Sequence, residues 1–297
     1  MNKGKIDKKA KQTSFVNFFI NAFLAIGKLI GGIISRSQAL ISSSIDSIND
    51  VISTGLVYFG IRKSQQEPDE GHPFGHERID NAASIILAFL FLITGLFIIY
   101  NAILTIAQSS EIPLETPTNI AWIVTLTAIG VKLILYFYTV FIARKANSSS
   151  LKGLARDHIF DIVAMSITFI AVIIAVELDI PILDPIAAIF TGLLLAYNGI
   201  KIVIEAINKM VDKSAPKPIV DKVETIVSRH EDVKRIYALR TRQFGNKIYV
   251  EIDISVDENL SVKQGHQIAT DIHDEIEKDI DEVKHVMVHV NPFKEKK

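Results

Sequence analysis

The apolar residues of this chain are concentrated in long runs over its first 210 residues, and a mixed polar pattern follows them. A helix needs about 20 mostly apolar residues to cross the hydrocarbon core of a bilayer. Six runs reach that length: residues 15–34, 39–61, 82–106, 119–143, 154–178 and 182–207. The pattern therefore predicts a membrane all-α bundle of six transmembrane helices in residues 1–210.

Residues 211–297 have the shorter periodicities of a small soluble domain. The expected elements are a helix over 217–230, strands over 234–242 and 247–256, a helix from an N-cap at Ser261 to Asp279, and a strand over 285–290. The turn Phe244-Gly245-Asn246 separates the first two strands. This order predicts a compact cytoplasmic α+β domain with the succession αββαβ.

Basic residues gather at alternate ends of the six runs, which predicts the orientation of the bundle. One side would hold Lys3, Lys5, Lys8, Lys9, Lys11, Arg62, Lys63, Arg78, Arg144, Lys145, Lys152, Arg156, Lys209 and Lys213. The loops on the other side offer Arg36 as their only cation. By the positive-inside rule, we expect both termini to be cytoplasmic.

Composition narrows the chemistry. The formal net charge is -1, which gives no reason to expect a nucleic-acid partner. The chain has no cysteine, so disulfides and thiolate metal sites are excluded.

Four aspartates interrupt two of the apolar runs. Asp46 and Asp50 are four residues apart in the second run, and Asp157 and Asp161 repeat that spacing in the fifth. Four residues are one helical turn plus about 40°, so each pair lies on one side of its helix. Leaving all four ionised and unpaired would cost about 10 kcal/mol on the insertion scale. A helix N-terminus could accommodate Asp157 alone, so the pattern favours a shared cation site.

An oxygen-only ligand set suits Mn²⁺, Mg²⁺ or Ca²⁺, whereas zinc and copper favour imidazole or thiolate. His158 follows Asp157 directly and points about 100° away from the aspartate face, so we expect it to support the site or line a path. Lys28, in the first run, can either extend toward the membrane interface or pair within the bundle.

The loop between the second and third runs reads PDEGHPFGHERID. Asp69, His72 and His76 could form a second metal cluster there, or the histidines could be ordinary solvated side chains. In the soluble domain, Asp253, His266 and His289 are metal-ligand candidates, with His273 and His285 as further ones; isolated surface histidines are the alternative.

Taken together, the six runs, both aspartate pairs, the HPFGHER loop and the trailing α+β domain resemble the cation diffusion facilitator family of metal–proton antiporters. The resemblance covers nearly the whole chain. It implies a transport site at the four aspartates, a loop site at Asp69, His72 and His76, and a metallochaperone-like cytoplasmic domain. It also implies a homodimer in the cell membrane of a prokaryote.

Two departures from zinc-type members bear on the cargo. Such members have histidine where this chain has Asp157, so the all-carboxylate set resembles manganese-transporting members. In the cytoplasmic domain, Tyr237 and Asp253 stand at positions of metal-binding histidines, and Asn291 stands at the position of an acidic ligand.

The sequence thus predicts a transporter rather than an enzyme: a Mn²⁺ exporter driven by inward proton flow through alternating access. The same antiporter with Fe²⁺, Co²⁺ or Zn²⁺ as cargo is the nearest alternative. An intramembrane metal-dependent hydrolase and a passive cation channel are alternatives of other classes, and no HExxH-like pairing supports the hydrolase.

Overall fold

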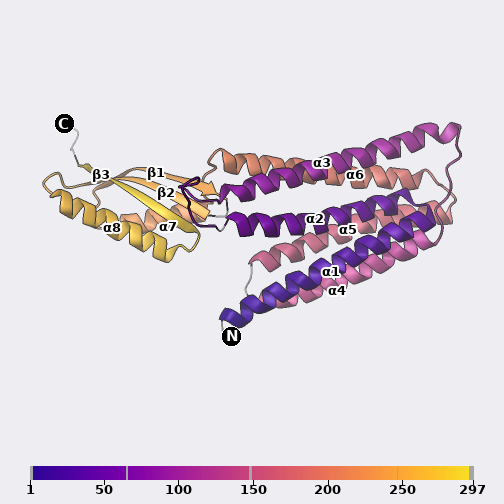
Figure 1. Cartoon of the computed structure of the whole chain (residues 1–297), viewed down its shortest axis with the longest axis horizontal. Helices are drawn as coiled ribbons and strands as arrows, with labels where there is room; N and C mark the ends of the chain where they lie inside the picture. The colour runs from indigo at the N-terminus through magenta and orange to yellow at the C-terminus, as the bar shows by residue number, and fades with distance from the viewer. Residues whose placement is uncertain (1–2, 65, 147–148, 246, 294–297) are drawn as a thin grey trace. The chain divides into compact units, whose positions relative to one another are not determined.

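A computed structural model describes residues 3–64, 66–146, 149–245 and 247–293. Long helices, joined by loops, account for most of the described chain as far as Met210 (Figure 1). They are α1 (Lys3–Ser35), α2 (Gln38–Ser64), α3 (Arg78–Ala107), α4 (Ile120–Ala146), α5 (Ser149–Glu177) and α6 (Leu183–Met210), with a short 3-10 turn η1 (Gln108–Ser110) after α3.

Five of these helices have segments that are long and apolar enough to cross a membrane. The segments are Phe15–Ser35, Arg78–Ser110, Ile120–Arg144, Leu154–Glu177 and Leu183–Met210. Helix α2 has a comparable length of 27 residues, but its serines, Asn49 and two aspartates lower its hydropathy, so it is not among the five found in the described residues. Of the six predicted spans, five are therefore long and apolar enough by composition to cross a membrane, and α2 does not meet that criterion.

The bundle core consists of small clusters where two to four helices meet. Leu24 of α1, Ala128 of α4 and Met165 of α5 form one of them. Leu40, at the start of α2, is fully buried in another, together with alanines of α4 and α6. The helices that carry the two aspartate pairs, α2 and α5, share this second cluster through Leu40 and Val172.

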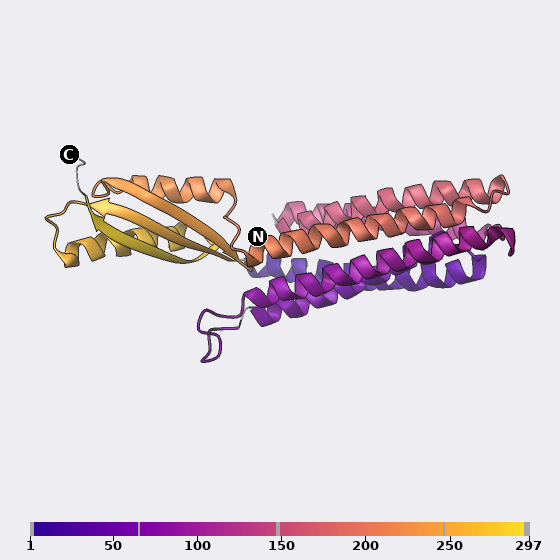
Figure 2. The same ribbon diagram turned by 90° about the horizontal axis from the view of Figure 1, so that it is seen from above.

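Helices α3 and α6 lie side by side and approach most closely through glycines (Figures 1 and 2). A Cβ on Gly192 would lie 2.8 Å from the carbonyl oxygen of Gly95, and one on Gly95 would lie 2.6 Å from that of Gly192. Both contacts are shorter than van der Waals separation, so only glycine allows this approach of the two backbones.

In the C-terminal part, one helix precedes the first two strands along the chain, and a second helix follows them before the third strand. Its elements are α7 (Lys217–Ser228), β1 (Arg235–Phe244), β2 (Lys247–Val256), α8 (Val262–Asp279) and β3 (Val283–Pro292). The sheet order is β1-β2-β3, with β1 antiparallel and β3 parallel to β2. Apolar side chains of both helices and alternate positions of β2 form one core.

This arrangement confirms the predicted order of helices and strands. Ser261 caps α8 in a capping box with Gln264, as the sequence predicted. The main difference is at β3, which begins at Val283, two residues before the predicted strand.

The chain divides into two compact units. One comprises Met1–Leu56 and Leu87–Lys201, and the other Val57–Ile86 and Ile202–Lys297. The second unit therefore includes one end each of α2, α3 and α6 and the loop between α2 and α3, together with the sheet.

The glycine contact gives a direct test of the bundle. We expect Gly192→Ala to lower the free energy of unfolding by about 1–3 kcal/mol, because the methyl group meets backbone atoms of α3. Gly130→Ala is the matched control, since a Cβ there has no atom within 4 Å. Thermal unfolding in detergent measures both, and equal midpoints would contradict the close α3–α6 contact.

Candidate metal centres

The start of α2 is attached to the start of α6 by Asp184, which is 3% exposed. Its Oδ1 accepts a hydrogen bond of 2.6 Å from the Ser37 hydroxyl. Its Oδ2 accepts hydrogen bonds from the backbone N–H groups of Gln38 at 2.5 Å and Ala39 at 3.3 Å. These N–H groups have no partner within their own helix, so the carboxylate of α6 caps α2 and fixes the position of its first turn.

Asp46 and Asp50 of α2 and Asp161 of α5 come together inside the first unit. Each residue offers a carboxylate oxygen, and these oxygens all lie within 4.8 Å of one another. All three side chains are partly buried. Three carboxylates this close repel one another strongly unless cations neutralise them, so the arrangement is suited to bind a divalent cation.

The fourth predicted ligand lies outside this group. Asp157 is one turn before Asp161 on α5, and its side chain is exposed. Among the described residues, it is not part of the cluster of ligand atoms. The structure thus brings together three of the four aspartates expected at the transport site.

A lysine contacts the carboxylate cluster, and the sequence had not indicated it. Lys132 of α4 is 2% exposed, and its Nζ donates a hydrogen bond of 2.5 Å to Oδ2 of Asp161. A lysine in the interior of an apolar run carries an insertion cost like that of an aspartate. The insertion cost that singled out the aspartates applies equally to lysines within apolar runs, and this criterion would have identified Lys132.

A second buried lysine lies nearby. Lys28 of α1 is 2% exposed, and its Nζ donates hydrogen bonds of 3.0 Å to both the carbonyl oxygen and the hydroxyl of Ser43. Of the two options that the sequence left open, the structure therefore has Lys28 pairing within the bundle.

His158 is buried beside the cluster and held in place by α1. Its Nε2 lies 2.6 Å from Oδ1 of Asn17, whose amide donates to the carbonyl oxygen of Thr13 at 2.8 Å. The other ring nitrogen is 4.0 Å from Oδ2 of Asp161. His158 thus links α1 and α5 next to the carboxylates, which agrees with the predicted supporting position.

The loop between α2 and α3 brings Asp69, His72 and His76 together, with ligand atoms within 4.8 Å of one another. Nδ1 of His72 is 3.2 Å from Oδ1 of Asp69, and Nε2 of His76 is 3.4 Å from its Oδ2. The backbone N–H of His72 donates a 2.7 Å hydrogen bond to the carboxylate, and this bond lowers the pKa of Asp69. This hydrogen bond orients the Asp69 carboxylate and favours its charged form, which suits cation binding.

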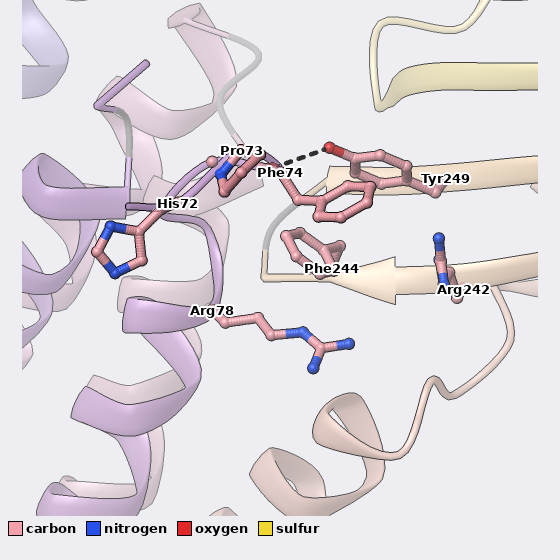
Figure 3. A pocket seen from close by; sticks show the side chains of 8 residues that line it. His72, Pro73, Phe74, Arg78, Arg242, Phe244 and Tyr249 are labelled. Carbon is pink, nitrogen blue, oxygen red and sulfur yellow. Dashed lines mark hydrogen bonds between the residues drawn. The ribbon is translucent and has the colours of Figure 1, made fainter. Parts of the chain in front are cut away.

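The same loop contacts the C-terminal sheet within the second unit. Gly75 has a φ of 92°, which favours glycine, and the chain turns there so that Phe74 lies near β2. The Tyr249 hydroxyl donates a 3.4 Å hydrogen bond to the carbonyl oxygen of Phe74 (Figure 3). Glu77 forms a close ion pair with Lys284 of β3.

The three ligands predicted in the cytoplasmic domain do not converge. The register of the sheet pairs Asp253 of β2 with His289 of β3, while His266 is exposed on α8. Within the described part of the chain, the three do not form a group of ligand atoms. A different group does: His273 and Glu277 of α8 with His285 of β3. The sequence had indicated the two histidines but not Glu277.

Apolar helices that enclose a carboxylate cluster define a membrane protein with an internal cation site. Comparison with known proteins agrees: residues 14–211 match the cation efflux transmembrane domain, and residues 215–293 match the cation efflux protein cytoplasmic domain. The chain is a member of the cation efflux, or cation diffusion facilitator, family of divalent metal transporters.

Two relatives from Bacillus subtilis (strain 168) align over almost their full lengths. The manganese efflux system protein MneP is 28% identical over 96% of this chain and 96% of its own. The manganese efflux system protein MneS is 30% identical over 97% and 98%. Among solved structures, the metal-bound C-terminal domain of the CzcD transporter from Thermotoga maritima is 32% identical, covers 25% of this chain and 87% of its own, and has a TM-score of 0.25.

These findings confirm the predicted family and its transporter class, and they show a multi-pass integral membrane protein rather than an enzyme.

The cap on α2 can be tested apart from the ligands. We expect Asp184→Ala to destabilise the protein by about 1–2 kcal/mol, because it leaves the N–H groups of Gln38 and Ala39 without their acceptor. Asp184→Asn keeps an acceptor oxygen and should lose less. Unchanged thermal unfolding of the alanine variant would contradict the capping role.

Proposed function

We propose that the protein exports Mn²⁺ from the cytoplasm by alternating access, in exchange for protons. The observation that supports this most directly is the convergence of Asp46, Asp50 and Asp161 between two helices. A hard divalent cation suits such a set of oxygen ligands. The manganese efflux systems among the relatives support the same cargo.

Asp157 belongs to the proposal as the fourth ligand, on the strength of the family resemblance. It is one helical turn from Asp161, so a small movement of the cytoplasmic end of α5 would bring its carboxylate toward the cluster. The loop group of Asp69, His72 and His76 is proposed as a second cation site.

Lys132 suggests how the empty site tolerates its charge. Its ammonium group occupies an oxygen of Asp161 that a metal ion would need. An arriving Mn²⁺ therefore has to displace a tethered cation, and when the metal leaves, Lys132 can return. This exchange would spare the empty carrier from holding uncompensated carboxylates while it changes conformation.

Protons would complete the cycle. Protons and divalent cations compete for the same carboxylate oxygens, so protons entering from the opposite side can promote metal release. The titration belongs to the cluster as a whole, and no single aspartate is assigned as the carrier.

The proposal also fixes the topology. Helix α2 would be the sixth span, with its aspartates facing the bundle, and residues 1–210 and 211–297 would form the membrane and cytoplasmic domains. Both termini would be cytoplasmic, in the cell membrane of a prokaryote. Two copies would form a homodimer, for which the match to the family's cytoplasmic domain is the support.

The cargo can be distinguished from Fe²⁺, Co²⁺ and Zn²⁺ by adding a nitrogen ligand. We expect Asp157→His to raise Zn²⁺ transport relative to Mn²⁺, because imidazole favours zinc. Uptake into inside-out proteoliposomes with competing metals measures the ratio. An unchanged ratio would count against a manganese-selective parent.

The central ligands give the simplest test of the function. Asp50→Ala and Asp161→Ala should each abolish Mn²⁺ uptake into inside-out proteoliposomes under an imposed pH gradient, because each removes a converging oxygen ligand. Glu205→Gln, which alters an exposed acid of α6, is the control and should retain transport. Full transport by both alanine variants would refute the site, and a flux indifferent to the pH gradient would favour a channel.

Lys132 can be tested through metal affinity. Two unit charges 4 Å apart interact by about 4 kcal/mol at an effective dielectric constant of 20, so removing the competing ammonium should strengthen Mn²⁺ binding by at least about tenfold. We expect Lys132→Gln to bind Mn²⁺ more tightly and to turn over more slowly. Lys132→Arg keeps the charge and should stay close to the parent. Weaker binding by the glutamine variant would contradict the displacement.

A further inference from the structure

The group of His273, Glu277 and His285 has the spacing of ligands around a metal ion. Nε2 of His273 is 3.2 Å from Oε1 of Glu277, and Nδ1 of His285 is 3.4 Å from the same oxygen. A tetrahedral ion with bonds of about 2.1 Å places its ligand atoms about 3.4 Å apart. The three side chains could therefore bind a cation with little rearrangement.

One of the imidazoles is already oriented for this. Nδ1 of His273 lies 2.7 Å from the carbonyl oxygen of Val286, which can only accept a hydrogen bond. This nitrogen therefore carries the proton, and the free electron pair of the neutral ring is on Nε2, directed toward Glu277. A backbone carbonyl that fixes the tautomer in this way is a common feature of metal-binding histidines.

The supporting elements are rigid. His273 and Glu277 are four residues apart on α8, and the neighbouring Ile272 and Ile276 are fully buried in the core of the domain. The backbone N–H of Val286 donates to Oε1 of Glu277 at 3.2 Å, which ties the helix to β3 next to His285. The ligands thus come from two elements whose relative position the core sets.

We propose that His273, Glu277 and His285 form a cytoplasmic binding site for a divalent cation of the zinc class, separate from the transport site. Two imidazoles with one carboxylate suit Zn²⁺ or Co²⁺, whereas the intramembrane group has oxygen ligands alone. The side chains are 30%, 32% and 52% exposed, so the site is open to solvent and leaves a fourth position for water.

The site lies beside the contacts that join β3 to the α2–α3 loop. Lys284, next to His285, pairs with Glu77. His285 itself is aligned with Tyr249 in the sheet, and the Tyr249 hydroxyl bonds to Phe74 of the loop (Figure 3). A cation would hold the start of β3 against α8 and so restrain the loop. This regulatory consequence rests on the proposed transport function; the site itself does not.

Binding is tested on the full-length protein in detergent by titration with Co²⁺, whose absorption is strong in four-coordinate sites and weak in octahedral oxygen sites. A His72→Gln background removes a ligand of the loop group. We expect one strongly absorbing Co²⁺ per chain, and at least about a tenfold loss of affinity in His285→Gln and in His273→Gln. His266→Gln on α8 and His289→Gln on β3 are matched controls and should bind like the parent.

The absence of this absorption in the parent, or equal affinity in all four variants, would overturn the site. The substituted side chains are solvent-accessible, so we expect the variants to fold like the parent. Equal thermal unfolding midpoints would exclude misfolding as the cause of any loss of Co²⁺ affinity.

Regulation is tested by Mn²⁺ uptake into inside-out proteoliposomes. Zn²⁺ that saturates the site from the cytoplasmic face should slow uptake at least about fivefold in the parent and leave His285→Gln much less affected. Equal inhibition of both would overturn the regulation. If the parent does not transport Mn²⁺ at all, the proposed function fails while the Co²⁺ result still decides the site.

Discussion

Carboxylates within an apolar helix bundle need compensating charge. Asp46, Asp50 and Asp161 converge within 4.8 Å, and Lys132 lies in hydrogen-bond contact with Asp161. Leaving one member of a buried ion pair without its partner costs about 3–5 kcal/mol. A cluster of this kind is therefore stable when it holds cations, whether these are lysines of the chain, protons or a metal ion.

The surrounding helices are fixed so that the carboxylates meet. Asp184 caps α2 from α6, and the Gly95–Gly192 contact brings α3 and α6 together. His158 and Asn17 join α5 to α1 beside the cluster. Each contact connects different helices, so the position of the aspartates is set by several independent interactions in the bundle.

Periodicity and spacing were sufficient to predict the long helices, the αββαβ order and the convergence of Asp46 with Asp161. Periodicity and spacing were less informative about contacts that depend on how two helices or strands pack against each other. Asp157 has the same four-residue spacing as the other pair, yet its side chain is exposed. Spacing along a helix does not determine how the helix is rotated relative to its neighbour, so the sequence could not predict this exposure. The group on α8 and β3 depends on how these two elements pack, so Glu277 could not be paired with His285 from the sequence. Lys132 was overlooked although its position within an apolar run made it detectable.

Anomalous diffraction near the manganese absorption edge, from crystals of Mn²⁺-loaded protein, would locate the bound metal ion. We expect an anomalous peak between the carboxylates of Asp46, Asp50 and Asp161, with Nζ of Lys132 moved away from Asp161. Manganese peaks confined to the loop or the cytoplasmic domain, with the Lys132–Asp161 pair intact, would contradict it.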